Sequence, residues 1–222
     1  MKTFKAEQCV AKLARSRACD RLQPLQQSVS SSGFQRGIMT PAETLKWNPP
    51  SCEAGTSAHR LYVFVEGADD QRFFHWYFDQ QYKVIIPYAQ MKKEKVNALM
   101  KGIQKIPETD YILLADADNQ SVADKIEKIK TRFSACEREK IYIVKREIES
   151  WYLAGLKASD CKKWHIHYYS HTNDLVKEDF DRLKPKHMSR IHFMLEILKR
   201  FDLSEGVERN GTFYHFCQKN RR

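Results

Sequence analysis

The most informative segment of this chain is Tyr111-Ile112-Leu113-Leu114, which continues into Ala115-Asp116-Ala117-Asp118-Asn119. The unbroken apolar run is typical of a strand that is buried on both faces of a parallel sheet. Two acids follow at alternate positions, where the strand should end. Parallel strands deliver their carboxyl ends to one edge of a sheet, and open α/β proteins bind ligands there. The segment therefore predicts a buried strand that leads into a candidate binding site.

The same arrangement occurs twice more in the chain. Leu61-Tyr62-Val63-Phe64 leads into Val65-Glu66-Gly67-Ala68-Asp69-Asp70, and Ile141-Tyr142-Ile143-Val144 precedes Arg146-Glu147-Ile148-Glu149-Ser150-Trp151. A further strand is predicted over residues 83–88. Helical patterns lie between and after the strands, at 69–81, 92–105, 122–135 and 148–158. This alternation predicts an α/β fold with a mainly parallel sheet and helices on both faces.

The two ends of the chain differ from this central part. Residues 1–58 contain few apolar residues and several Ser and Pro, so we expect a disordered or extended arm, unless the true start is Met39. Residues 59–158 form the expected core. Residues 159–222 should form a small α-rich extension packed on it. Within this extension, alternation predicts a short strand over 163–168, and a stripe of Ile191, Met194, Leu195 and Leu198 predicts a helix over 189–201.

The composition narrows the class of protein. The 222 residues include 38 Lys and Arg but only 28 Asp and Glu, a net charge of +10 that favours a polyanionic partner such as nucleic acid. No apolar run approaches the roughly 18 to 20 residues that span a bilayer. The six cysteines show no CxxC spacing, which indicates reduced thiols in a cytoplasmic protein.

The acids after the three strands form a candidate metal site. Carboxylates held close together repel one another unless a cation or a proton lies between them. Strand alternation would place Asp116 and Asp118 on the same side. Only one of Glu147 and Glu149 need face the site, and a buried helix face with Ile148 would favour Glu149. Simpler alternatives are solvated loop acids, helix-dipole partners and surface salt bridges to neighbouring lysines or arginines. The candidate metal ligands are Glu66, Asp70, Asp116, Asp118, Glu147 and Glu149.

These residues carry a resemblance to a known family. Val65-Glu66-Gly67 followed by Asp70, then Asp116-Ala117-Asp118 after an apolar strand, resembles the Toprim fold of topoisomerases, primases and nucleases of the overcoming-lysogenization-defect type. Glu147 to Ala154 resembles a segment of small standalone Toprim-like bacterial proteins. The resemblance covers about residues 60–155. It implies a Rossmann-like domain that uses Mg²⁺ or Mn²⁺ to cleave phosphodiester bonds in DNA or RNA, plausibly in phage defence or mobile-element biology.

The resemblance also implies roles for individual residues. Glu66 would be a metal ligand or general acid/base, and Asp116 and Asp118 would bind the metal. Asp70, with Glu147 or Glu149, would help to hold a second ion. A cation over the scissile phosphate would assist cleavage, and Lys184 and Lys186 are candidates. An ordinary basic loop is the alternative for these two lysines.

Other features suggest partners. Lys162, Lys163 and Trp164 combine charge with a ring that could stack on bases, and they join Lys184 and Lys186 as candidate nucleic-acid contacts. A zinc site using the nearby histidines is less favoured, because four ligands need not converge there. The chain has no phosphate-binding ATPase motif, so any ATPase would be a separate chain. A homodimer is a further candidate state. The alternative function is a Toprim-like module that binds nucleic acid or a partner ATPase without cleaving.

Overall fold

The computed structural model describes residues 60–78 and 83–220, which all lie in the second of the two units of the chain, Ser57–Arg222. The expected arm over 1–58 and the alternative start at Met39 fall outside these residues, as do Cys9, Cys19 and Cys52. Four parallel strands form one sheet in the order β2-β1-β3-β4. The strands are β1 (Arg60–Val65), β2 (Lys83–Pro87), β3 (Thr109–Asp116) and β4 (Ile141–Val144).

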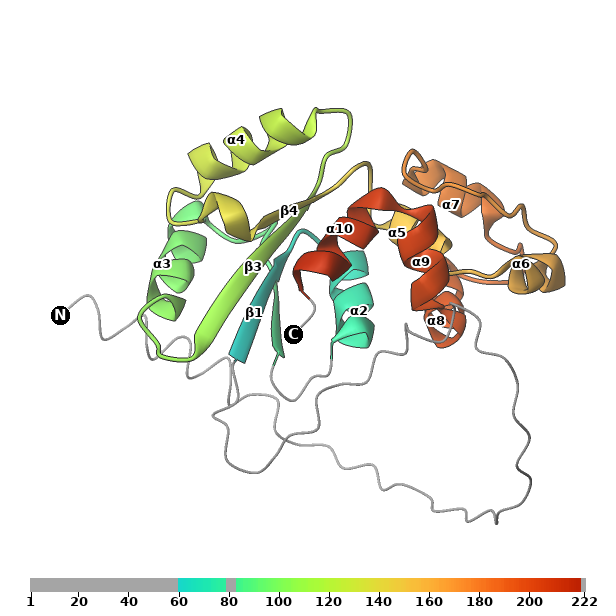
Figure 1. The fold of residues 1–222 in the computed structure, drawn as a ribbon, viewed down its shortest axis with the longest axis horizontal. Coiled ribbons are helices and arrows are strands. Elements are labelled where there is room, and N and C mark those ends of the chain that lie inside the picture. Colours follow the sequence, from blue (N-terminus) through green and yellow to red (C-terminus); the bar gives the residue numbers. More distant parts are fainter. Residues whose placement is uncertain (1–59, 79–82, 221–222) are drawn as a thin grey trace, which may run out of the picture. The chain divides into compact units, whose positions relative to one another are not determined.

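Helices cover both faces of this sheet. In Figure 1, α3 and α4 lie on one side of the sheet, and α2 and α10 lie on the other. The prediction of a parallel α/β fold with a helix-rich C-terminal extension is confirmed. The helices are α2 (Ala68–Tyr77), α3 (Lys93–Ile103), α4 (Val122–Arg132), α5 (Glu149–Ala154), α6 (Ala158–Trp164), α7 (Lys177–Leu183), α8 (Arg190–Arg200), α9 (Leu203–Arg209) and α10 (Gly211–Lys219), with a short 3-10 helix at Arg138–Lys140.

The strands are apolar at successive positions because both of their faces are covered. In β1, Val63 and Val65 belong to the core that includes the aromatic residues of α2. Phe64 points to the opposite face, where its ring lies 6.1 Å from that of Tyr111 in an edge-to-face contact. All of these side chains are buried. The unbroken apolar runs of the sequence therefore reflect a two-sided sheet.

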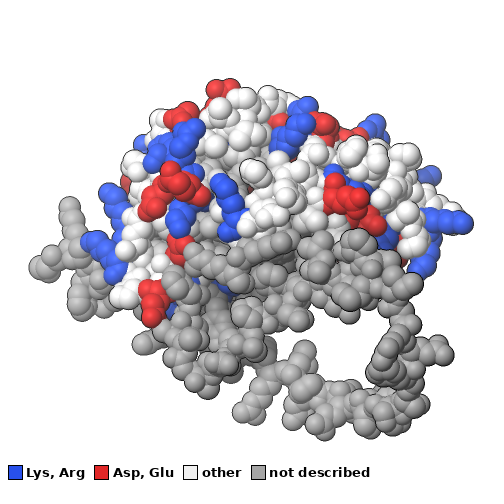
Figure 2. Space-filling view, viewed as in Figure 1, with Lys and Arg blue, Asp and Glu red and all other residues white. Residues whose placement is uncertain are grey.

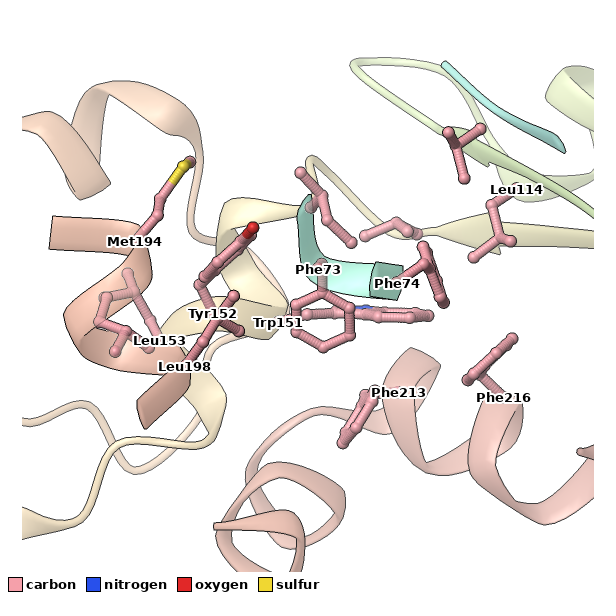
Figure 3. Packing of buried hydrophobic residues seen from close by; sticks show 14 of the residues in the cluster. Phe73, Phe74, Leu114, Trp151, Tyr152, Leu153, Met194, Leu198, Phe213 and Phe216 are labelled. Atoms are coloured by element: carbon pink, nitrogen blue, oxygen red, sulfur yellow. The ribbon is translucent and has the colours of Figure 1, made fainter. Parts of the chain in front are cut away.

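An aromatic cluster joins the sheet to the C-terminal helices. Phe73 of α2 lies 5.8 Å from Trp151 of α5, and Trp151 lies 5.0 Å from Phe213 of α10 (Figure 3). Phe74 contacts Phe216 at 5.5 Å. The first helix thus uses its aromatic residues for core packing, and α10 closes the same core.

The strand predicted over 163–168 is wrong. Helix α6 continues to Trp164, and His165 ends it in a left-handed conformation with φ of 55°. The alternation itself is real, because Trp164, Ile166 and Tyr168 pack on the core and the histidines between them are exposed. The segment has no neighbouring strand in the described part of the chain, so its one-sided burial does not make it part of a sheet.

Two details of the helices also differ from the predictions. The single helix predicted over 148–158 is divided into α5 and α6, because α5 ends at Gly155, where a Cβ would lie 2.3 Å from the Phe201 ring. In α8, Met194 is buried as predicted, but Ile191 and Leu195 are exposed and Phe193 and Ile197 face the core instead. The predicted helical period is confirmed. The predicted orientation of the helix is wrong for two of the four residues in the stripe, because these two face away from the core. None of the helices in the described ranges is long and apolar enough to cross a membrane.

Candidate functional site

The acids gather at the carboxyl edge of the two central strands. β1 and β3 are neighbours in the sheet, with Phe64 opposite Leu113. Glu66 follows β1 directly, and Asp116 is the last residue of β3. Asp70 lies in the first turn of α2, one helical turn after Glu66. Parallel pairing therefore brings together residues that are about fifty positions apart in the chain.

Asp70 is buried without full hydrogen bonding. Its exposed fraction is 4%. Oδ2 accepts a hydrogen bond from the Gly67 amide at 3.0 Å, whereas Oδ1 is buried and has no hydrogen-bond partner among the described residues. Burial raises the pKa of the Asp70 carboxyl to about 7, and the charges of Glu66 and Glu149 act in the same direction.

Asp116 is in a similar position. Its Oδ1 is also buried and lacks a hydrogen-bond partner within the described ranges. Burial raises the pKa of this carboxyl well above its usual value, and Asp70, Glu66, Glu149 and Asp118 raise it further. We call these five residues, Glu66, Asp70, Asp116, Asp118 and Glu149, the acidic cluster. Two of its members, Asp70 and Asp116, hold buried oxygens without a hydrogen-bond partner in the described residues, and such oxygens favour a proton, a cation or another donor.

Lys125 of α4 supplies one positive charge to the acidic cluster. Its Nζ lies 3.1 Å from Asp118 Oδ2 and 3.4 Å from Glu66 Oε1, and the residue is 8% exposed. Burial lowers the pKa of the Lys125 ammonium, but the two acids outweigh this effect and the net shift is upward. The ammonium therefore stays charged. Tyr88 donates its hydroxyl to the same Glu66 oxygen at 3.2 Å and to the Leu114 carbonyl at 3.1 Å.

Asp118 does not continue the alternation of β3. The strand ends at Asp116, and Asp118 has a left-handed backbone with φ of 55°. Its side chain is half-exposed, whereas Oδ1 of Asp116 is buried. Arg146 fixes this turn through two hydrogen bonds. Its guanidinium donates to the Asp118 carbonyl, and its own backbone carbonyl accepts a bond from the Asp118 amide at 3.2 Å. The extrapolation that placed both acids on one side of a strand is wrong.

Arg190 of α8 supplies a second positive charge. Its guanidinium pairs with Glu149 of α5, with Asp69 at 3.3 Å and with Asp181. Burial raises the pKa of the Glu149 carboxyl to about 6, although Arg190 opposes the shift. Glu149 is 5% exposed, so it is the buried member of the Glu147–Glu149 pair.

Glu147 faces elsewhere. Its Oε2 accepts the Lys177 amide at 2.5 Å, and its Oε1 lies 3.5 Å from the Lys177 ammonium. Lys145 pairs with Asp174 at 2.8 Å rather than with either glutamate. The structure thus separates two residues that the sequence left equivalent: Glu149 joins the acidic cluster, and Glu147 contacts α7.

The predicted nucleic-acid contacts differ in how exposed their side chains are. The Trp164 ring packs against Phe193 at 5.6 Å and beneath the Arg200 guanidinium at 5.1 Å, so it is held within the protein and does not form a free stacking surface. Lys162 and Lys163 are exposed beside it. Lys184 donates to the Met188 carbonyl at 2.8 Å, and Lys186 is exposed. Neither Lys184 nor Lys186 forms an ion pair with the acidic cluster.

Charge is mixed on the face that Figure 2 shows. Basic and acidic side chains are interspersed over this face and do not gather into one basic surface. Any polyanion that approaches this face meets both signs of charge. Recognition there would depend on local groups rather than on a broad attractive field.

Sequence reasoning missed Lys125, Tyr88 and Arg190. Lys125 lies one turn before Ile129 on the inner side of α4, where an apolar residue is normal. Arg190 is the first residue of α8, where the helix dipole disfavours a cation. Both placements are signals of an acidic partner. Tyr88 gives no comparable signal, since its contacts depend on the position of β2 beside β1.

The fit of the acidic cluster to a metal ion can be tested on its oxygens. As it stands, the described part of the chain holds no group of three or more His, Cys, Asp or Glu side chains arranged to ligate a metal. The chemistry of the donors does fit, because Asp70 Oδ1 and Asp116 Oδ1 are unpartnered carboxylate oxygens, the ligand type that Mg²⁺ and Mn²⁺ prefer. The charges of Glu66 and Glu149 raise the pKa of both carboxyls, so these two glutamates are candidates for further donors. Comparisons with models of protein families, with curated proteins and with solved structures found no match to this chain.

Proposed function

We propose that this chain is a cytoplasmic nuclease that uses Mg²⁺ or Mn²⁺ at a Toprim-like acidic edge to cleave phosphodiester bonds in DNA or RNA. One observation carries the proposal: Asp70 Oδ1 and Asp116 Oδ1 are buried, adjacent to further acids and without hydrogen-bond partners in the described residues. Such groups are costly to bury unless a ligand completes them. The described cysteines, Cys136, Cys161 and Cys217, are free thiols, in keeping with a reducing compartment.

Asp70, Asp116 and Glu149 would hold the ion. When bound, the ion would polarise the phosphate and stabilise the charge that develops on it. Glu66 Oε1 already accepts a hydrogen bond from Tyr88 and forms an ion pair with Lys125. This leaves Glu66 Oε2 free to take a proton from an attacking water. Arg190 keeps Glu149 at the edge of the site, and the aromatic core behind α2 and α5 makes that edge rigid.

The test is cleavage of labelled single- and double-stranded DNA and RNA with Mg²⁺, Mn²⁺ or EDTA. The key variant is Asp116→Asn, which keeps the shape of the side chain and removes its charge. Cleavage should require the metal and fall about 100-fold or more in this variant. The matched control is Asp110→Asn, since Asp110 lies at the opposite end of the same strand and pairs with Lys140. Its activity should match the wild type.

A second candidate function is supported by the ion pairs. Lys125 and Arg190 already neutralise part of the acidic cluster, as they would in a protein that binds nucleic acid or a partner ATPase without cleaving. The same experiment separates the two. If folded wild-type protein cuts none of the substrates with either metal, the nuclease proposal is wrong and the binding module is favoured.

A further inference from the structure

The acidic cluster has two halves with different charge balance. In one half, Glu66 Oε1 and Asp118 Oδ2 both contact the Lys125 ammonium, at 3.4 and 3.1 Å. In the other half, Asp70 and Asp116 have no ion pair within the described ranges, and each has a buried oxygen without a partner. One half therefore already contains a cation, and the other lacks one.

We infer that Lys125 is a built-in counter-ion that occupies the Glu66–Asp118 half of the acidic cluster, so that the protein takes up one divalent cation, at the Asp70–Asp116 half, rather than two. This inference rests on the proposed metal site and specifies how many ions it holds. It also makes Lys125 a fixed positive charge beside the ion.

The position of Lys125 in the fold makes it hard to displace. Its side chain is 10% exposed and extends from α4, whose N-cap Ser121 follows the Asp118 turn closely. A tethered ammonium has a high effective concentration at its partners, unlike a free ion. Within the described residues, Lys125 has ion pairs only with Glu66 and Asp118, and an expelled ammonium would lose both of them. Two cations a few ångströms apart also repel each other strongly in a buried site.

The number of bound Mn²⁺ ions tests this inference. Free Mn²⁺ would be measured by electron paramagnetic resonance during a titration of the full chain. Wild type should bind one ion, which Asp116→Asn should lose. Lys125→Met keeps the apolar stem of the side chain and removes the charge, so it should bind two. Lys125→Arg retains the charge and should still bind one. The matched control is Lys128→Met, on the exposed side of the same helix, and it should behave as wild type.

Thermal unfolding shows whether the variant is folded and adds a readout that is independent of cleavage. Lys125→Met should melt at a lower temperature than wild type in EDTA, because Glu66 and Asp118 then face each other without a cation. Mn²⁺ should restore the melting temperature more in Lys125→Met than in wild type, since two ions stabilise the variant.

Any other number of bound Mn²⁺ ions in wild type or in Lys125→Met contradicts the inference. Two ions in wild type would mean that Lys125 does not exclude the second. A single ion in Lys125→Met with unchanged affinity would mean that the lysine blocks nothing. A single ion bound more tightly would mean that lysine and metal compete for one position. If wild type binds one ion that Asp116→Asn loses, and only the Lys125 results fail, then the metal site stands and the inference alone falls. If wild type binds no Mn²⁺, the proposed function fails with it.

Discussion

Two buried polar clusters in this protein have opposite characters. One surrounds Arg209 and Asn210 at the junction of α9 and α10, with exposed fractions of 4% and 0%. The other is the acidic cluster at the carboxyl edge of the sheet. Around Arg209 each nitrogen finds an acceptor, whereas Asp70 and Asp116 each keep a buried oxygen that has no donor among residues 60–78 and 83–220.

The Arg209 cluster is complete within the protein. Its guanidinium donates to the carbonyls of Tyr169, Ala154 and Leu156 and lies 4.1 Å from the Tyr168 ring centroid. Asn210 donates to Thr172 and accepts the amide of Phe213 at 3.0 Å. These bonds tie the loops after α5 and α6 to the C-terminal helices.

The difference distinguishes a structural cluster from a binding cluster. A buried polar group with all its bonds made contributes to stability, whereas one with bonds unmade lowers it until a ligand arrives. Asp70 and Arg209 have the same exposed fraction, 4%. Satisfaction of the polar atoms, rather than burial alone, therefore indicates where a ligand should bind.

The largest expected effect is at the structural cluster. Arg209→Met should lower the free energy of unfolding by about 3 kcal/mol, because it leaves three buried carbonyls without donors. Urea unfolding followed by circular dichroism would measure this. Arg138→Met is the control, since Arg138 forms an exposed pair with Glu127 and should contribute less than about 0.5 kcal/mol. If Arg209→Met and Arg138→Met lowered the free energy of unfolding equally, the Arg209 cluster would contribute no more than an exposed ion pair. The contrast between the two buried clusters would then be lost.

A smaller effect is expected at the acidic cluster. Acid usually destabilises folded proteins, whereas here a lower pH should stabilise the fold. Asp70 has a folded-state pKa of about 7 against a usual value of 3.8, so the folded protein binds more protons than the unfolded chain between these values. In EDTA, the contribution of Asp70 to the free energy of unfolding should therefore be greatest below about pH 4. This contribution should be lost as the pH rises through 7. The melting temperature at pH 8 should be lower than at pH 5 by about 5 °C.

Two controls make this pH dependence specific. Asp70→Asn should reduce the difference between pH 5 and pH 8, because its side chain does not titrate. Mg²⁺ should reduce the difference in wild type, because it supplies the missing positive charge at pH 8. A melting temperature that rises from pH 5 to pH 8 in EDTA would show that the acidic cluster is not under electrostatic strain.

The smallest effect separates the two glutamates after β4. Glu147→Gln should change Mn²⁺ affinity less than about twofold, since Glu147 contacts Lys177 rather than the acidic cluster. Glu149→Gln should weaken Mn²⁺ binding by about tenfold or more, because it removes a buried anionic donor. Calorimetric titration of both variants would check this pair, and a larger effect from Glu147→Gln would reverse the assignment.

The sequence predicted the features that depend on local pattern. The four strands and the parallel sheet follow from apolar runs that alternate with helical patterns. The gathering of Glu66 and Asp116 at one edge follows from parallel pairing of the strands before them. Their role as metal ligands stays a prediction.

The features that depend on distant packing could not be predicted in this way. Arg190 reaches Glu149 across 41 positions, and Arg209 reaches the Ala154 carbonyl across 55. A local pattern can indicate that Arg190 has an acidic partner, but it does not identify which distant residue that partner is. The false strand over 163–168 has the same origin, because alternation reports one-sided burial but not whether a neighbouring strand exists.

The Arg190–Glu149 pair also has a consequence for biosynthesis. Arg190 joins the growing chain 41 residues after Glu149, which at 5 to 20 residues per second is about 2 to 8 s later. During that interval all four strands have been made, but the acid that begins α5 has no counter-ion. A nascent chain that stopped before α8 would lack the Arg190 partner of Glu149, whereas Asp69 would keep its ion pair with Arg72. The acidic edge therefore reaches its final charge balance late in translation, when α8 has been synthesised.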